Sequence, residues 1–152
     1  MNRVTVRQAV LADLEQLTDL FDQYRQFQGK AADLPACRAF LHDRFNHAES
    51  AVFLATMADH SVGFAQLYPS FSSTALARVF ILNDLFVAEA GRRAGVASAL
   101  LAAVEEYAGS FGACRVSLNV AKVNASARSL YEAKGWVRDG EFFTYHRYPP
   151  TP

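Results

Sequence analysis

The spacing of hydrophobic positions predicts one strand and two helices at the start of the chain. Residues 4–8 alternate between polar and apolar side chains, which is typical of a strand with one buried face. Residues 13–28 carry an apolar stripe at helical spacing. A second amphipathic helix is expected over 34–47, where Pro35 suits the first helical turn.

Three strands are expected in the middle of the chain. Residues 51–58 and 61–71 predict an antiparallel hairpin. Residues 75–87 predict a longer strand that is apolar on both faces, as expected when both faces are covered. The dipeptide Asn83-Asp84 interrupts this strand, and burying two polar residues is costly unless they are paired or open to a cleft. It marks either a strand end or solvated edge, or a bulge that turns polar groups into a site.

The C-terminal half alternates helices and strands. A long helix is expected over 93–110, a strand over 115–120 and a short helix over 124–134. The strands before and after the long helix should be parallel, because a helix between them makes a right-handed crossover. Residues 136–148 are rich in aromatic side chains and are expected to hold the last strands, followed by an extended tail over 149–152.

Composition favours a single globular domain, which we expect over residues 1–148. The chain has 152 residues, of which 51% are hydrophobic and 20% charged, and its formal net charge is zero. This neutral balance, with scattered arginines, argues against nucleic acid or an acidic membrane surface as a partner. There is no pattern of a signal peptide and no run near the roughly 18 apolar residues of a membrane-spanning helix.

The cysteines and histidines indicate neither disulfides nor a metal site. Cys37 and Cys114 are far apart, which suggests a reducing compartment and a cytoplasmic protein. We interpret Cys114 as a core residue. His42 and His47 are five positions apart on a predicted helix and do not share a face, so no metal ligand pair is expected.

The loop before the long helix carries no residue that caps a helix. Residues 90–95 read AGRRAG, without Ser, Thr, Asp or Asn. A helix start leaves about four backbone N–H groups without partners, and here two arginines and small residues surround them. This pattern predicts a site for phosphate or pyrophosphate, with a solvated helix start as the alternative. The two common glycine-rich phosphate motifs are absent.

The second half of the chain carries two short motifs. Arg92, Gly95 and Ala97 form an R-x-x-G-x-A pattern, and residues 124–136 form an N-x-x-A-x-x-L-Y-x-x-x-G-W pattern. These motifs resemble the acetyl-coenzyme-A loop, Q/R-x-x-G-x-G/A, and the N-x-x-A-x-x-L/F-Y-x-x-x-G-F/W pattern of the GNAT superfamily of N-acetyltransferases. The strand end 84–87, DLFV, is similar to the spermidine/spermine-acetyltransferase-like and Hpa-type branches. The resemblance implies an α/β (α+β) fold with a mostly antiparallel sheet of six to seven strands, about four helices and a parallel strand pair around a cofactor cleft.

The resemblance also implies a reaction and a set of residues. The reaction is transfer of an acetyl group from acetyl-CoA to a primary amine by direct attack. Tyr131 would protonate the leaving thiolate, with a packed aromatic as the alternative. Asp84 would accept amine protons through water, bind the ammonium group or hold a nearby backbone N–H. The implied cofactor-binding residues are Leu85, Phe86, Val87, Arg92, Arg93, Ala94, Gly95, Val96, Ala97, Ser98, Asn124, Ala125, Ser126 and Ala127.

The acceptor amine is less defined than the cofactor. Polyamine-acetylating relatives carry acidic residues where this chain has Asn83 and Arg25, so we expect a polyamine to be a poor acceptor, and Arg25 permits an acidic one. The candidates for the acceptor pocket, with core or dimer packing as the alternative, are Tyr24, Phe27, Tyr68, Phe71, Phe143 and Tyr145. A small amine, an amino acid, an antibiotic and a protein lysine or N-terminus all remain open.

Two further expectations concern assembly and catalysis. Many members of the superfamily are homodimers, and the aromatic residues of 142–148 would allow pairing across a two-fold axis. A non-catalytic acyl-CoA-binding or regulatory module with the same fold is the alternative to an enzyme. The presence of Tyr131 and the open small-residue loop favour the enzyme.

Overall fold

The computed structural model describes residues 3–152, and the chain forms two compact units, Met1–Asn119 and Val120–Pro152, which we describe separately. The first unit holds a sheet, three helices and two short 3-10 turns. Its elements are β1 (Val4–Gln8), η1 (Leu11–Asp13), α1 (Leu14–Phe27), α2 (Leu34–Asn46), β2 (Ala51–Met57), β3 (His60–Ser72), β4 (Ala77–Val87), η2 (Glu89–Gly91), α3 (Val96–Ser110) and β5 (Arg115–Ser117). The prediction of one domain over 1–148 stays a prediction.

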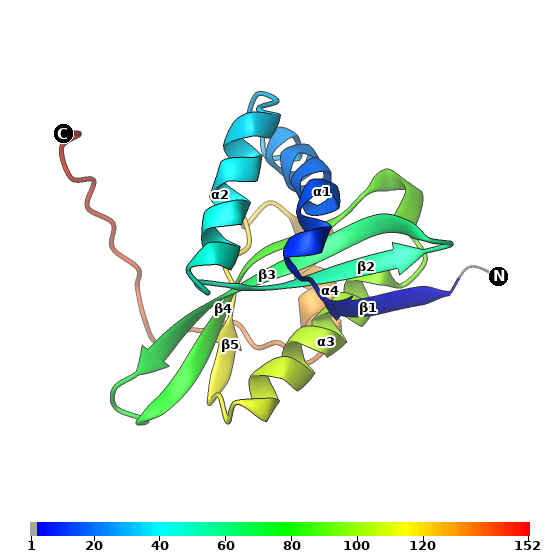
Figure 1. The fold of residues 1–152 in the computed structure, drawn as a ribbon. Helices are drawn as coiled ribbons and strands as arrows, with labels where there is room; N and C mark the ends of the chain where they lie inside the picture. Colours follow the sequence, from blue (N-terminus) through cyan, green and yellow to red (C-terminus); the bar gives the residue numbers. More distant parts are fainter. Residues whose placement is uncertain (1–2) are drawn as a thin grey trace. The chain divides into compact units, whose positions relative to one another are not determined.

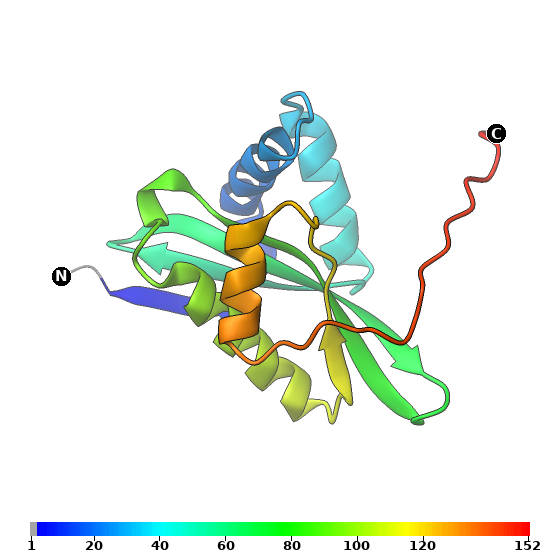
Figure 2. The same ribbon diagram turned by 180° about the vertical axis from the view of Figure 1, so that it is seen from behind.

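The sheet of the first unit has the order β1-β2-β3-β4-β5. Its first four strands are antiparallel, and β4 and β5 are parallel, as the crossover through α3 requires. Figures 1 and 2 show α1 and α2 on one face of this sheet and α3 on the other. The mixed, mostly antiparallel architecture with a parallel pair is therefore confirmed.

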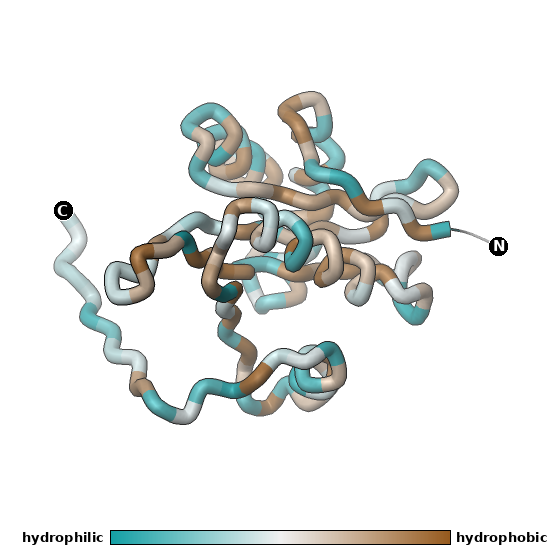
Figure 3. The backbone as a smooth tube through the Cα atoms, turned by 90° about the horizontal axis from the view of Figure 1, so that it is seen from below, coloured by the Kyte–Doolittle hydropathy of each residue, from teal (hydrophilic) through white to brown (hydrophobic). Residues whose placement is uncertain are grey.

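Hydrophobic residues fill the space between the sheet and the helices on both of its faces. The central strands read as nearly continuous apolar runs because both faces are covered. Figure 3 shows these hydrophobic positions running through the strands, with polar positions at the turns. One side of the core is closed by Leu14, Leu17 and Leu20 of α1, and α3 buries Val96, Leu100, Leu101 and Val104.

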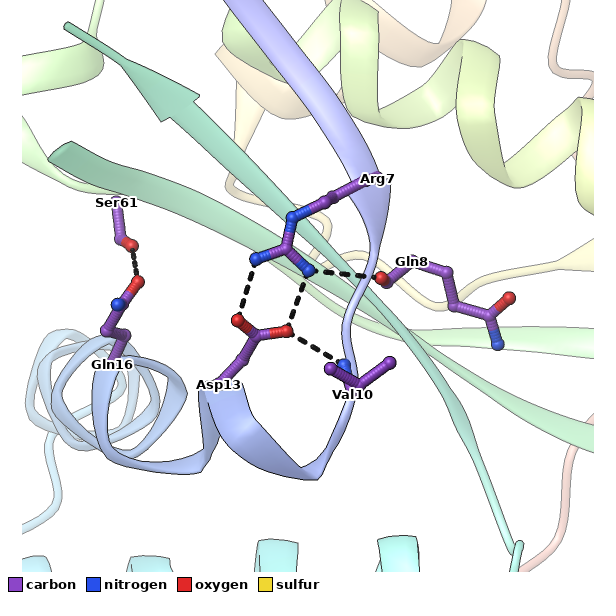
Figure 4. Close-up of polar contacts among 6 residues, drawn as sticks. All are labelled: Arg7, Gln8, Val10, Asp13, Gln16 and Ser61. Atoms are coloured by element: carbon purple, nitrogen blue, oxygen red, sulfur yellow. Dashed lines mark hydrogen bonds and ion pairs between the residues drawn. The ribbon is translucent and has the colours of Figure 1, made fainter. Parts of the chain in front are cut away.

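An ion pair joins β1 to the start of α1 (Figure 4). The two terminal nitrogens of Arg7 donate to the two carboxylate oxygens of Asp13 at 2.8 and 2.7 Å, and the same carboxylate accepts from the backbone N–H of Val10 at 2.8 Å. Hydrogen bonding from Arg7 holds the pKa of Asp13 below its usual value. The carboxylate thereby satisfies backbone and side-chain donors where the chain turns from strand to helix.

The second unit contains one helix, α4 (Ala125–Ala133), and an extended C-terminal segment. The strands predicted over 136–148 are not formed, which is why the described residues hold five strands instead of six or seven. A strand needs a neighbouring strand to satisfy its backbone, and this segment has no such pairing among the described residues. Its large side chains are exposed, namely Val137, Phe142, Phe143, Tyr145 and Tyr148.

Some boundaries in the first unit also differ from the predictions. The long strand starts at Ala77, two residues later than expected, because residues 73–76 form a turn in which Leu76 has a φ of 51°. The strand predicted over 115–120 ends at Ser117, where its pairing with β4 also ends. Among the described residues no helix is both long and apolar enough to cross a membrane.

Candidate functional site

On the side that faces β5, the C-terminal half of β4 pairs with no described strand. Pairing between the two strands covers only Val79–Ile81 against Arg115–Ser117, whereas β4 continues to Val87. On its other edge β4 is paired with β3, but Gln66 pairs with Asp84 and the next residue, Leu67, pairs with Leu82. Asn83 is therefore the extra residue of a bulge and is exposed, whereas Asp84 beside it is buried. The bulge is confirmed, and its role in a site stays a prediction.

The open strand leads into a helix start without a side-chain cap. The N-cap of α3 is Gly95, with a φ of 78°, and no described side chain accepts a hydrogen bond from the first helical N–H groups. The predicted helix start at Arg93 is wrong by three residues, because Arg93 and Gly95 both have left-handed φ values that a helix does not allow. The absence of a cap is confirmed, and the unpaired N–H groups belong to the first turn of α3.

Two glycines hold this loop and helix close to β3. A Cβ atom on Gly91 would lie 2.8 Å from Cβ of Val62, and a Cβ atom on Gly63 would lie 2.8 Å from the carbonyl oxygen of Phe86. By contrast, a Cβ atom on Gly95 would meet nothing within 4 Å. The loop is therefore closely packed on its sheet side, whereas a side chain at Gly95 would meet no steric obstacle.

The two loop arginines have different surroundings. The Nε of Arg92 donates to the carbonyl oxygen of Val87 at 3.3 Å, and its guanidinium lies 5.8 Å from the ring centre of Phe27. Arg93 is exposed. A strained left-handed φ of 63° at a non-glycine residue is uncommon and tends to occur at functional sites. The guanidinium groups of Arg92 and Arg93 both belong to the segment just before the uncapped start of α3.

Asp84 lies at the bulge as a buried carboxylate held by neutral donors. It is 5% exposed and accepts from Nε2 of Gln66 at 2.8 Å and from Nδ2 of Asn83 at 3.1 Å. The hydroxyl of Tyr24 also donates to it. Burial raises the pKa of Asp84, and the three hydrogen bonds oppose that rise. Burial and hydrogen bonding therefore act on the proton affinity of Asp84 in opposite directions, and burial has the larger effect.

Of the residues predicted to bind the acceptor, Tyr24 and Tyr68 interact with Asp84, whereas the side chain of Arg25 lies between the first two helices. Tyr24 contacts Asp84, and the negative charge of Asp84 also acts on Tyr68, whose pKa burial raises to about 12. Phe27 is exposed and its ring lies 6.3 Å from that of Phe86. Arg25 belongs elsewhere, because its Nη1 lies 3.9 Å from Sγ of Cys37 between α1 and α2.

The second unit carries the other predicted site residues. The side-chain oxygen of Asn124 accepts from the backbone N–H of Ala127 at 3.2 Å and so caps α4. The ring of Tyr131 lies 5.9 Å from that of Trp136, and burial raises the pKa of the Tyr131 hydroxyl. The Tyr131 hydroxyl therefore holds its proton at neutral pH, as a proton donor requires, although burial makes it a weaker acid.

The structure adds one residue to those predicted from the sequence and corrects the position of another. Gln66 was missed, although a glutamine inside the apolar run Val62–Leu67 is a signal of a buried polar contact. Cys114 was expected in the core and is exposed, because it precedes β5 at the edge of the sheet. Among the described residues, no group of three or more potential ligands is arranged to hold a metal ion.

The fold and this strand–loop–helix site define an acetyltransferase of the GNAT class. Residues 14–136 match the acetyltransferase (GNAT) family, and the chain belongs to that family. It is 42% identical over 142 residues to "Uncharacterized N-acetyltransferase YhfO" of Bacillus subtilis (strain 168), covering 93% of this chain and 95% of the relative. It is 30% identical to a "Probable acetyltransferase" of Haemophilus influenzae, covering 82% of this chain and 84% of that protein.

Solved structures agree with this assignment. The crystal structure of a "probable acetyltransferase" is similar with a TM-score of 0.91 and 38% identity, covering 97% of this chain and 99% of that one. Aminoglycoside N-acetyltransferase AAC(6')-Iy, solved in complex with CoA, has a TM-score of 0.80 at 21% identity, covering 97% of this chain and 96% of that one. The second similarity supports the fold alone.

Proposed function

We propose that the protein is an N-acetyltransferase that moves an acetyl group from acetyl-CoA to a primary amine by direct attack in a ternary complex. One observation carries this proposal: the edge of β4 is open beyond Ile81 and leads into the uncapped start of α3. A ligand with an extended, hydrogen-bonding arm joined to a pyrophosphate fits an open strand edge followed by an uncapped helix start, and coenzyme A has that form.

The donor is bound through backbone groups in this proposal. The open edge at Leu85, Phe86 and Val87 accepts the pantetheine arm as an added strand would be accepted. The first N–H groups of α3 bind the pyrophosphate, because the positive end of the helix dipole faces an anion there. Arg92 and Arg93 add positive charge beside the pyrophosphate, and the small residues Ala94 and Gly95 leave room for it.

The remaining cofactor residues belong to the second unit. The side-chain oxygen of Asn124 caps α4 by accepting a hydrogen bond from the N–H of Ala127. Its amide nitrogen is then the group that we assign to a pantetheine carbonyl. The small residues Ala125, Ser126 and Ala127 form the first turn of α4 and suit close contact with the cofactor.

The chemical step needs a base and an acid, and the chain offers one of each. An acceptor ammonium first loses a proton, and its nitrogen attacks the thioester carbonyl carbon. The C–N bond forms, the C–S bond breaks, the nitrogen loses a second proton and the thiolate takes one, so one proton is released overall. Asp84 receives amine protons through water or holds the ammonium charge, and Tyr131 protonates the thiolate.

The acceptor that we propose is a small molecule or peptide with a primary amine. A buried carboxylate whose described donors are all neutral favours a cationic ligand group over an anionic one. An acidic acceptor, which Arg25 would permit, is the alternative, and Nη1 of Arg25 lies 3.9 Å from Sγ of Cys37. Spermidine as the best substrate in an amine panel would contradict our expectation that a polyamine is a poor acceptor.

We also propose that the protein acts in the cytoplasm as a homodimer. The exposed aromatic residues of the C-terminal segment, Phe142, Phe143, Tyr145 and Tyr148, support this proposal because such a group favours burial against a partner. Size-exclusion chromatography with light scattering tests it, and the double variant with Phe143→Ser and Tyr145→Ser should elute as a monomer. A wild-type chain that is monomeric at all concentrations would contradict the dimer.

The central experiment measures acetyl-CoA binding by calorimetry and CoA release over a panel of amines. Arg93→Asn removes a charge while keeping a residue that tolerates a left-handed φ, and should weaken acetyl-CoA binding several-fold, less so at high salt. Arg3→Asn removes one charge from an exposed position at the start of the chain and should leave binding unchanged. Binding without CoA release for any amine would favour the non-catalytic module.

A further inference from the structure

Gln66 is a fully buried polar side chain in an otherwise apolar stretch of β3. Its exposed fraction is 0%, and its neighbours over Val62–Leu67 are apolar residues of the core. In the strand pairing it lies directly opposite Asp84, at the last pair before the Asn83 bulge. A buried amide in this position is costly unless it makes a specific contact.

The contact that Gln66 makes is to Asp84. Its Nε2 donates to Oδ2 of Asp84 at 2.8 Å, whereas its Oε1 has no hydrogen-bond partner within residues 3–152. A core glutamine that served only packing would be replaced at lower cost by an apolar residue of similar length. The hydrogen bond to the Asp84 carboxylate therefore explains why a glutamine occupies this buried position.

Three neutral donors from three elements surround that carboxylate. Gln66 comes from β3, Asn83 from β4 and Tyr24 from α1. The other titratable side chain that its charge affects is Tyr68 of β3, which is also influenced by Arg44 of α2. Because Gln66 is the most deeply buried of the three donors, its position is the most restricted by packing.

We propose that Gln66 is a positioning residue that fixes the orientation of the Asp84 carboxylate and keeps it negatively charged for the acceptor amine. This inference rests on the proposed acetyl transfer and adds to it a residue that touches neither substrate. Hydrogen bonds to the charged form of a carboxylate favour that form, so removal of the donor raises the pKa of Asp84.

Gln66→Met tests the proposal because methionine has similar length and no donor. The carbon-13 resonance of the Asp84 carboxyl group, followed by NMR over pH, should titrate about one to two pH units higher in this variant, the equivalent of one hydrogen bond to a charged group. The acidic limb of the kcat/KM profile should move by the same amount. Gln16→Met is the matched control, because Gln16 is exposed on α1 and bonds to Ser61.

A second variant keeps the test decisive if Gln66→Met does not fold. Gln66→Glu retains a polar side chain of equal length and places a second carboxyl group beside Asp84, so the higher of the two apparent pKa values should rise further. An unchanged Asp84 titration in a folded variant would overturn the proposal, and so would a shifted titration without a shifted kcat/KM profile. If the wild-type protein transfers no acetyl group, the proposed function fails, while the NMR titration still decides whether Gln66 controls Asp84.

Discussion

Gly63 of β3 and Val96 at the start of α3 lie closer together than a side chain at position 63 would allow. A Cβ atom on Gly63 would lie 3.1 Å from Cγ1 of Val96 and 2.8 Å from the carbonyl oxygen of Phe86. Since Val96 is the first residue of α3, this contact fixes the height of the uncapped helix start above the sheet.

Gly63→Ala should therefore destabilise the protein by about 1–3 kcal/mol, because the backbone carbonyl oxygen of Phe86 cannot move aside as a flexible side chain would. It should also weaken acetyl-CoA binding by displacing α3. Urea denaturation and calorimetry measure the two effects. Gly109→Ala is the matched control: a Cβ there meets nothing within 4 Å, and alanine should stabilise α3 by about 0.5–1 kcal/mol. Equal effects in both variants would contradict the packing argument.

Asp13→Asn should cost about 1.5–3 kcal/mol at neutral pH, because it removes the negative charge that Arg7 and the N–H of Val10 bond to. The exposure of Arg7 favours the lower part of that range. The folded-state pKa of Asp13 is lowered, so its contribution is present above the unfolded-state pKa and is lost as the pH falls. Urea denaturation from pH 7 to pH 3 should show the cost disappearing. The exposed pair of Glu15 and Arg38 provides the control, since Glu15→Gln should cost less than about 1 kcal/mol.

Asp84 should respond to pH in the opposite direction. Its folded-state pKa is raised, so the folded protein holds the proton more tightly, and stability falls as the pH rises from the unfolded-state pKa to the folded one. Asp84→Asn removes the charge and should stabilise the protein by about 1 kcal/mol at pH 7, with a gain that fades in acid. The same variant should lower CoA release by about 10²-fold or more, if Asp84 is the base. A less stable Asp84→Asn protein at pH 7 would show that the carboxylate is needed for folding.

Local signals in the sequence were sufficient for the parts of the site that depend on neighbouring residues. The missing cap before α3 is visible in residues 90–95, and the polar dipeptide Asn83-Asp84 indicated the bulge. The helix start was placed too early, because composition does not show that Arg93 adopts a left-handed φ. Motif spacing, together with the resemblance that it supports, thus predicted the family and the loop.

Features that depend on distant residues were not predicted. Gln66 contacts Asp84 only because the register of β3 and β4 places the two residues opposite each other. The hydrophobic pattern of one strand does not predict its register with another strand. The contact between Nη1 of Arg25 and Sγ of Cys37 also joins two helices and is not visible in the sequence, while the role of Arg25 at the acceptor stays a prediction. Likewise, the aromatic content of 136–148 predicted strands, whereas a strand also needs a partner in the sheet.

Tyr131→Phe separates the proposed acid from a residue that only packs. Phenylalanine keeps the ring that lies 5.9 Å from Trp136, so the thermal unfolding temperature should change little. The kcat should fall by about 10²-fold, because the thiolate must then take its proton from water, while the KM for acetyl-CoA stays the same. Tyr107→Phe is the matched control, since Tyr107 packs against Phe53 and Phe80. A Tyr131→Phe enzyme with wild-type kcat would leave Tyr131 with the packing role, and the leaving thiolate would then need no acid from this chain.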